Sequence, residues 1–444
     1  MKSKKRTVLT GFIFVLIIAG IIALFYFGER SAPEIIFTPQ PESFLPASKN
    51  FIITFKDKGQ GLKEIEVFIE QNNNHYQLLR KNFPRQNHLL KHTITITIMP
   101  KKIALKDGPA FLGALAYDHS IWHWGKGNYK EVRYAVMVDT TPPIIEVLTR
   151  IHNLAKGGSE LVIYRASEPL LNHGVRANGW FYPGFQRQGL YLCFFAYPYN
   201  GPENAFYRVI GEDKAGNKSE GGFYYRLLKR KFKQDKIIIT DQFLRAKMPE
   251  FWHIYPELEG KYLETFIKVN TELRAKTTDE IKRICSTSYN SLLWQGPFLR
   301  MRGAETSSFG EKRTYYYKGQ VIGKSIHLGV DIASITNAPI PAANNGIVIY
   351  KGYLGIYGNT IIIDHGLGLF SLYGHLSSFN VEVDKRVKKG EIIGYTGATG
   401  LAGGDHLHFG ILLHGEFVNP IEWFDPKWVK SHILSKFKQA GLLH

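Results

Sequence analysis

The stretch Asp405-His406-Leu407-His408-Phe409-Gly410-Ile411-Leu412-Leu413 places two imidazoles two residues apart in an otherwise apolar run. Its Leu, Ile and Phe content is typical of a buried β-strand, in which residues i and i+2 face the same side, roughly 6.5–7 Å apart. His406 and His408 therefore share one face of the predicted strand. We expect a β-sheet domain in this part of the chain, with a functional site on that face.

A second stretch, His327-Leu328-Gly329-Val330-Asp331, places a His and an Asp four residues apart. On a flat strand these two side chains would lie roughly 13 Å apart, too far to bind one ion. Gly329 permits the backbone to bend, so a shared role requires a curved or bulged chain at this point. With one of the two histidines of the predicted strand, the pair supplies two imidazoles and one carboxylate. Such a donor set leaves a fourth position open, as in catalytic zinc sites.

Three motifs together resemble the signatures of the lysostaphin/LytM-type zinc endopeptidases of the M23 family, namely His327-x-x-x-Asp331, Tyr373-Gly374-His375-Leu376 and His406-Leu407-His408-Phe409. Supporting matches lie between them, including Val387-Lys388-Lys389-Gly390 and Thr396-Gly397-Ala398-Thr399-Gly400. The resemblance covers about residues 295–425. Asp405 and Gly410, which flank the last motif, stand where Pro and Glu are common in the family.

The resemblance implies that His327, Asp331 and His408 bind one Zn²⁺ per chain. It implies that His375 and His406 are the catalytic residues beside the metal and the scissile carbonyl; which of them is the general base stays open. Imidazoles, with a pKa near about 6.5, suit proton transfer at neutral pH. The implied activity is hydrolysis of peptide bonds in peptidoglycan stem peptides or cross-links, by a zinc-bound water, on a small antiparallel β-sheet with a narrow groove.

The bond that is cut stays open at this stage: it could join two D-amino acids, D-Ala and diaminopimelate, or two glycines. Asn359 and Tyr373 are weaker candidates for residues that line the cleft, and His365 also fits the family pattern. The spacer Glu311–Ser325, with Tyr315 to Tyr317, predicts a loop near the cleft that could set substrate preference.

The N-terminal residues predict where in the cell the protein is located. Thr7–Phe27 carries no charge and follows four basic residues (Lys2, Lys4, Lys5 and Arg6). A helix of that length spans roughly 31 Å, enough for a bilayer core. We therefore expect a single-pass anchor in the bacterial inner membrane, with the C-terminal part periplasmic or extracytoplasmic. The alternative is a cleavable signal peptide, but its apolar region would be about 7–15 residues long, and Pro33 follows the small pair Ser31-Ala32.

The composition is that of a globular protein with a basic balance. The 444 residues include 56 Lys and Arg against 38 Asp and Glu, a net charge of +18. That charge suits an anionic wall polymer or a membrane surface, and the predicted export makes a nucleic-acid partner unexpected. We expect peptidoglycan as substrate and contact with the inner membrane; divisome or other cell-wall proteins as partners stay unknown. The chain has two cysteines, Cys193 and Cys285, which is too few for a disulfide-rich fold. Both are predicted to be buried, and one disulfide between them stays an alternative.

The predicted fold is mainly β, with a helical interruption. Residues 1–30 form the cytoplasmic tip and anchor, and 33–140 and 141–240 form two β-sandwich modules. The modules follow from a repeat of about 100 residues and resemble bacterial immunoglobulin-like domains; one larger irregular β domain is the alternative. A helical linker spans 241–290, the peptidase domain 291–428 and a tail 429–444. The modules would hold the peptidase domain away from the membrane and could limit access to its groove.

Two segments before the peptidase domain allow more than one interpretation. Apolar residues recur at helical spacing, which favours a face packed on the neighbouring domain over a partner-binding face (Leu258, Tyr262, Phe266, Val269, Leu273). A basic run precedes them and is either a solvated linker or a site for anionic polymer or lipid (Arg226, Lys229, Arg230, Lys231, Lys233, Lys236). Two rival functions also stay open: a non-catalytic scaffold that activates a cell-wall amidase, and a protease for protein substrates.

Overall fold

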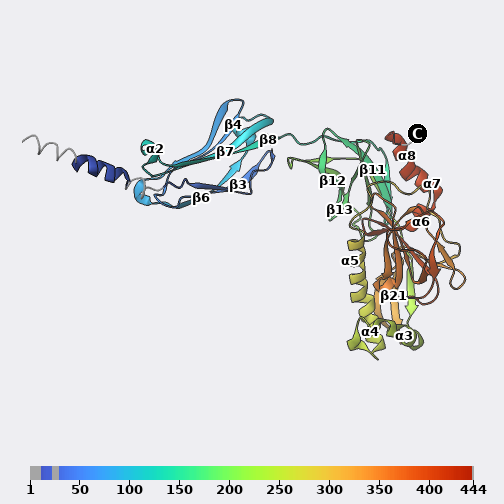
Figure 1. Ribbon diagram of the computed structural model, residues 1–444. Helices are drawn as coiled ribbons and strands as arrows, with labels where there is room; N and C mark the ends of the chain where they lie inside the picture. The colour runs from blue at the N-terminus through green and yellow to red at the C-terminus, as the bar shows by residue number, and fades with distance from the viewer. Residues whose placement is uncertain (1–11, 23–29, 443–444) are drawn as a thin grey trace, which may run out of the picture. The chain divides into compact units, whose positions relative to one another are not determined.

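The computed structural model describes residues 12–22 and 30–442 (Figure 1). The chain divides into two compact units, Met1–Pro142 with Glu212–Lys218, and Pro143–Gly211 with Ser219–His444. Strands predominate in both, which confirms the prediction of a mainly β fold.

Only part of the predicted membrane anchor can be described. Within Thr7–Phe27, residues 12–22 are helical, while 7–11 and 23–27 lie outside the described residues. In the ranges 12–22 and 30–442, no helix has the length and apolar character needed to cross a membrane. The anchor therefore stays a prediction.

The first unit consists of two β-sheets around one core. The three-stranded sheet has the order β1–β3–β6 and the five-stranded sheet the order β2–β8–β7–β4–β5. Alternate residues point inward from the two sheets, for example Phe51 and Ile53 from one and Val67 and Leu112 from the other. The strands are β1 (Glu34–Thr38), β2 (Phe44–Leu45), β3 (Lys49–Lys56), β4 (Leu62–Gln71), β5 (Asn74–Asn82), β6 (Lys91–Ile98), β7 (Gly108–Asp118) and β8 (Tyr129–Val138). Its resemblance to immunoglobulin-like domains stays a prediction.

The second unit begins with a further β module. One sheet has the order β14–β15–β11–β9 and another the order β13–β12–β16–β17, while β10 pairs with β18. Their bounds are β9 (Ile145–Val147), β10 (His152–Ala155), β11 (Ser159–Ala166), β12 (Leu170–Ala177), β13 (Trp180–Pro183), β14 (Phe185–Arg187), β15 (Leu190–Ala196), β16 (Tyr207–Asp213), β17 (Lys218–Gly221) and β18 (Tyr225–Leu228). Cys193 in β15 and Cys285 are both buried and free, which confirms that they are core residues and leaves no disulfide between them.

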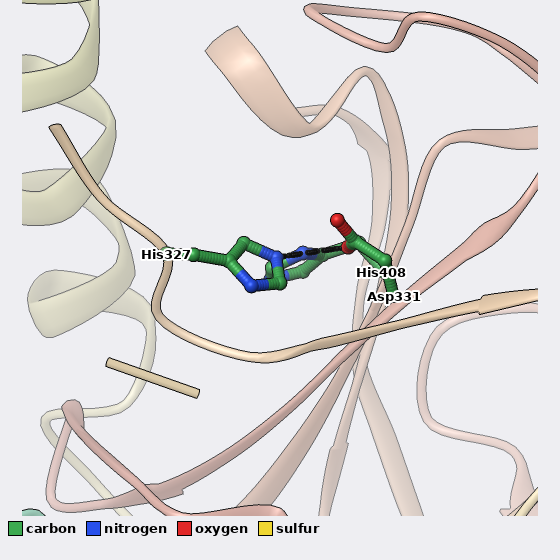
Figure 2. Close-up of side chains that lie close together, drawn as sticks. All are labelled: His327, Asp331 and His408. Carbon is green, nitrogen blue, oxygen red and sulfur yellow. Dashed lines mark hydrogen bonds and ion pairs between the residues drawn. The ribbon is translucent and has the colours of Figure 1, made fainter. Parts of the chain in front are cut away.

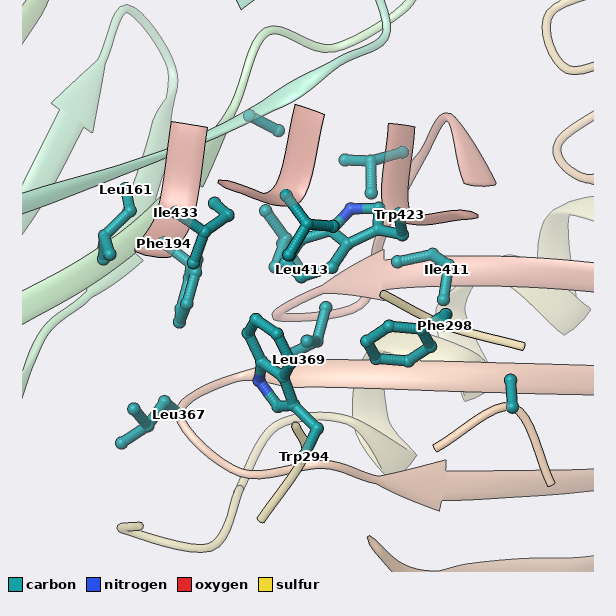
Figure 3. Packing of buried hydrophobic residues seen from close by; sticks show 14 of the residues in the cluster. Leu161, Phe194, Trp294, Phe298, Leu367, Leu369, Ile411, Leu413, Trp423 and Ile433 are labelled. Carbon is teal, nitrogen blue, oxygen red and sulfur yellow. The ribbon is translucent and has the colours of Figure 1, made fainter. Parts of the chain in front are cut away.

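The core of this β module continues into the C-terminal domain. Leu161 of β11 and Phe194 of β15 belong to the same buried cluster as Trp294 and Trp423 (Figure 3). The segment predicted as a tail, 429–444, is helical as far as Gln439 and adds Val429, Ile433 and Phe437 to that cluster. The β module and the C-terminal domain thus share one core.

The C-terminal domain is organised around an antiparallel sheet of order β20–β23–β31–β27–β26–β25–β29, with β32 paired to β31. A smaller sheet has the order β24–β30–β28. The strands are β20 (Ala304–Ser307), β23 (Val330–Ala333), β24 (Pro339–Pro341), β25 (Gly346–Tyr353), β26 (Asn359–Asp364), β27 (Leu369–Gly374), β28 (Leu376–Phe379), β29 (Arg386–Val387), β30 (Ile392–Thr396), β31 (Leu407–Leu413) and β32 (Glu416–Val418). In β31 every residue is buried, which explains why its sequence is continuously apolar.

The two faces of this sheet are covered by different parts of the chain. Ile411 and Leu413 face the core shared with the β module, whereas Leu412 faces a second core. That second core includes helical residues of the predicted linker, among them Phe266 and Leu273. The helices are α3 (Asp241–Lys247), α4 (Tyr262–Lys268) and α5 (Arg274–Ile284), with a π-helical turn, η5 (Val269–Leu273), between the last two. The apolar stripe therefore packs on the neighbouring domain, as predicted.

The spacer Glu311–Ser325 is a β-hairpin, so the prediction of a loop is wrong. Strand β21 (Lys312–Tyr317) pairs with β22 (Gln320–Ile326) across a two-residue turn. Lys318 and Gly319 have φ values of 48° and 82°, the left-handed conformation that a tight hairpin turn requires. Strand β19 (Gln234–Ile238) adds to this hairpin in parallel with β21. The hairpin and β19 form a separate three-stranded sheet.

His365 provides a test of the packing. It is buried, its Nδ1 donates to the Asn345 carbonyl over 2.7 Å, and burial lowers its pKa to about 4. Between pH 6.5 and about 4 the unfolded chain binds a proton that the folded chain does not, so stability falls as the pH falls. We expect His365 to account for about 2 kcal/mol of the stability lost between pH 7 and pH 5. In His365→Gln this share should vanish when denaturant unfolding is measured at both pH values.

The matched control for this prediction is His253→Gln, because His253 is exposed. That variant should lose as much stability between pH 7 and pH 5 as the unaltered chain. An unchanged pH dependence in His365→Gln would contradict the argument.

Candidate metal centre and its cavity

Three side chains converge in the C-terminal domain: His327, Asp331 and His408 (Figure 2). Nε2 of His327 lies 2.9 Å from Oδ1 of Asp331 and 3.0 Å from Nδ1 of His408. Nδ1 of His408 lies 2.9 Å from the same carboxylate oxygen. Two imidazole nitrogens and one carboxylate oxygen therefore face a common point, and all three residues are buried.

The register of the sheet creates this arrangement. Asp331 of β23 is the direct cross-strand partner of His408 in β31. His327 reaches the pair because β22 ends at Ile326 and β23 begins only at Val330, which confirms that the chain leaves a flat strand here. A Cβ on Gly329 would lie 2.5 Å from Nε2 of His408, so the missing side chain allows the close approach.

Further contacts orient two of these three donors. Nδ1 of His327 donates to the Ser308 carbonyl over 3.0 Å, so its Nε2 presents a lone pair. Oδ2 of Asp331 accepts from Nη2 of Arg313 over 3.0 Å, which leaves Oδ1 for the convergence point. Nε of Arg313 in turn donates to Glu311 over 3.2 Å. Arg313 was not among the residues predicted from sequence, because nothing in its local sequence indicates contact with Asp331.

The electrostatics suit a cation. Burial would raise the pKa of Asp331, but the charge of His327 and the hydrogen bonds of the three neighbouring imidazoles lower it well below its usual value. Burial lowers the pKa of His408 to about 4. Metal ligands must be deprotonated, and both groups are so at neutral pH. Two imidazoles, one carboxylate and an open side toward a cavity fit a zinc ion.

His375 and His406 lie beside this centre, with their ring centroids 4.8 Å apart. His375 has a φ of 67°, a strained conformation that turns it away from the path of β27, and its Nδ1 donates to the Thr399 carbonyl. Nδ1 of His406 donates to the Gly404 carbonyl, and its Nε2 lies 3.6 Å from Oδ1 of Asp331. Both rings are thus held with Nε2 free of backbone partners.

The pKa values of these two histidines move in opposite directions. Burial, with the charges of His406 and His408, lowers the pKa of His375 well below its usual value. Burial also lowers the pKa of His406, but the hydrogen bond to Asp331 and its charge outweigh that effect and raise it. One imidazole is therefore neutral at physiological pH, and the other takes up a proton more readily.

All five predicted site residues line one cavity of about 300 Å³. The same cavity is walled by residues from outside the three sequence motifs (Ile237, Ile238, Ile239, Phe243, Phe266, Arg274, Arg313, Tyr315). Strand β19 thus contributes directly to the cavity. So does the helical segment, which was predicted only as a linker. The hairpin residue Tyr315 lies at the cavity, as its predicted position near the cleft suggested.

Residues 325–420 match Peptidase family M23. The chain carries a peptidase M23 domain at these residues. This match covers the whole set from His327 to His408 and ends just after the last strand of the sheet, β32.

Three curated relatives align with the M23 domain region. The DD-carboxypeptidase/endopeptidase Mpg of Neisseria meningitidis is 40% identical over 96 residues, 22% of either chain. The peptidoglycan DD-endopeptidase ShyC of Vibrio cholerae is 35% identical over 115 residues, 26% of either chain. The murein hydrolase activator EnvC of Escherichia coli is 35% identical over 129 residues, 29% of this chain and 27% of EnvC. The matches span about a quarter of the length of these relatives.

Among solved structures, the catalytic domain of lysostaphin from Staphylococcus simulans is 27% identical. It covers 28% of this chain and 92% of its own, with a TM-score of 0.24.

The weaker candidates Tyr373 and Asn359, and Asp405 beside the last motif, form hydrogen bonds with other parts of the M23 domain. Tyr373 is buried in the core, where its hydroxyl accepts from the Ala343 amide. Asn359 donates to the Leu376 carbonyl, and Asp405 accepts from Thr396. These three residues and His365 do not line the cavity of the M23 domain in the described structure.

Gly329 provides a test of the metal centre. Gly329→Ala should displace the His408 ring and lower zinc affinity about 10–100-fold, the effect expected when a ligand loses its orientation. The measurement is competition for zinc with a chromogenic chelator. Gly403→Ala is the control, because a Cβ there meets nothing within 4 Å. Equal zinc affinities for the two variants would argue against the described convergence.

Proposed function

We propose that this chain is a zinc-dependent endopeptidase that hydrolyses peptide bonds in peptidoglycan stem peptides or cross-links. The observation that carries the proposal is the convergence of His327, Asp331 and His408 beside two further imidazoles on one cavity. The names of two relatives of the M23 domain, a DD-carboxypeptidase/endopeptidase and a peptidoglycan DD-endopeptidase, support the choice of substrate.

In this proposal, Nε2 of His327, Oδ1 of Asp331 and Nδ1 of His408 hold the ion. When bound, zinc activates water for attack and polarises the scissile carbonyl. His375 and His406 line the same cavity, and each has an Nε2 free of backbone partners. They are placed to take a proton from the attacking water, to return it to the leaving amine and to hydrogen-bond the oxyanion. Backbone carbonyls fix both rings before substrate arrives.

The second candidate function is a scaffold that activates a cell-wall amidase. The similarity to a murein hydrolase activator favours it. A scaffold of this kind does not require a metal centre. Here all five residues are present, and four of them have additional contacts that orient them for catalysis or binding. We therefore rank the enzyme first.

We also propose that the chain is anchored in the bacterial inner membrane, with the M23 domain on the periplasmic or extracytoplasmic side. The support is the charge-free segment Thr7–Phe27 behind a basic N-terminus. A substrate in the cell wall requires the same side of the membrane.

The test is mass spectrometry of fragments released from purified peptidoglycan by the full chain. His408→Ala should abolish both zinc binding and cleavage, because it removes a ligand. His375→Ala and His406→Ala should retain zinc but lower the cleavage rate about 10²–10⁴-fold, the usual contribution of a proton-transfer group.

The exposed His253 provides the matched control, since His253→Ala should cleave as well as the unaltered chain. Cleavage that persists at full rate in His408→Ala would overturn the proposal. Stimulation of a purified amidase by a chain that releases nothing itself would favour the scaffold.

A further inference from the structure

One cation in the cavity has no acidic partner. Arg274, the first residue of α5, lines the cavity together with the five site residues. It forms no ion pair with any residue in the described part of the chain. The other cation, Arg313, is already bound to Asp331 and Glu311. Asp331 is the one carboxylate that lines the cavity among the described residues, and it is already paired with Arg313, so Arg274 is the cation left for a ligand.

The guanidinium of Arg274 is held in place by one residue. Its Nε donates to the Asn270 carbonyl over 3.3 Å, and its Nη2 donates to Oδ1 of Asn270 over 3.1 Å. Asn270 is itself buried and donates to the Lys324 carbonyl of β22. Because a guanidinium has five N–H donors, the remaining ones are available to a ligand in the cavity. Such a fixed planar fork suits a carboxylate.

Arg274 also lies close to the reacting groups. Helix α5 packs against the turn η6 (Gly355–Tyr357), and the charge of Arg274 acts on the hydroxyl of Tyr357. The Tyr357 ring lies 4.9 Å from the His408 ring and 6.5 Å from the His375 ring, measured between centroids. A substrate that reaches the five site residues therefore enters a cavity whose wall includes Arg274.

We infer that Arg274 determines specificity by binding a free carboxylate that the substrate carries next to the scissile bond. The inference rests on the proposed function and names the substrate class. A carboxypeptidase substrate carries this carboxylate at its chain end. A cross-link between D-Ala and diaminopimelate carries it on the carbon beside the cross-linked nitrogen. A bond inside a glycine bridge has none, so of the three bonds left open by the sequence the glycine bond is excluded.

The test compares a peptide ending in D-Ala-D-Ala with its C-terminal amide, using the zinc-loaded full chain. For the unaltered chain, amidation should lower kcat/KM about 10–100-fold, the effect of losing a charge-assisted hydrogen bond. Arg274→Gln should lower kcat/KM for the free acid by a similar factor and should cleave the amide as the unaltered chain does. The same comparison applies to a D-Ala–diaminopimelate cross-linked dimer with and without amidation.

Two variants serve as controls. Arg283→Gln changes the same charge on the same helix, but Arg283 is exposed and pairs with Glu280, so both peptides should be cleaved normally. Arg274→Lys keeps the charge without the fork and should recover only part of the free-acid preference. A merely structural role for Arg274 would lower cleavage of both peptides equally, and that outcome would overturn the inference.

A binding measurement separates this inference from the proposed function. Calorimetry with His406→Ala, compared with His406→Ala carrying Arg274→Gln, reports affinity while any cleavage is slow. A free-acid preference of about 10–100-fold that disappears with Arg274 supports the inference even if the chain hydrolyses nothing. Equal affinities for the free acid and the amide overturn it, whether or not the chain is an enzyme.

Discussion

The cross-strand pair of Asp331 and His408 is the constraint on which the rest of the site depends. The antiparallel register places the two residues directly opposite each other on β23 and β31. His327 then needs only a short bend around Gly329 to complete the set. Because both faces of the surrounding sheet are covered by packed cores, the register cannot slip without exposing an entire apolar face to water. The positions of Asp331 and His408 are therefore fixed by the sheet.

The segment predicted as a linker has two structural tasks. Its buried side chains, such as Phe266 and Leu273, cover one face of the sheet that carries Asp331 and His408. At the same time Phe266 and Arg274 wall the cavity, together with residues of β19. The match to the M23 family begins only at residue 325, so these walls lie outside it. Any preference that this chain has among substrates of the family is accordingly expected to come from residues 237–274 and the hairpin.

The motif residues were predictable from sequence, whereas their surroundings were not. The family resemblance singled out His327, Asp331 and His408, and the structure brings these three side chains together, while their role as metal ligands stays a prediction. The hairpin was missed because the turn Lys318-Gly319 depends on a left-handed lysine, a conformation that composition does not reveal. Arg313 was missed because its contact with Asp331 lies 18 residues along the chain, and Arg274 because it reaches the cavity from a helix outside the three motifs. Tyr373 belongs to a motif yet points into the core, because it lies opposite Phe409 of β31, and Phe409 and its neighbour His408 face opposite sides of the sheet.

Arg313 and Arg274 have different electrostatic roles in the cavity wall. Burying the Asp331 carboxylate without a counter-charge would be costly, and Arg313 offsets that cost at Oδ2 while leaving Oδ1 for the convergence point. With Arg313 so engaged, its charge is largely balanced by Asp331 and Glu311. The charge of Arg274 is not balanced in this way, and a bound divalent cation would add to it. If the chain is the proposed endopeptidase, we therefore expect it to prefer a substrate that brings its own negative charge into the cavity.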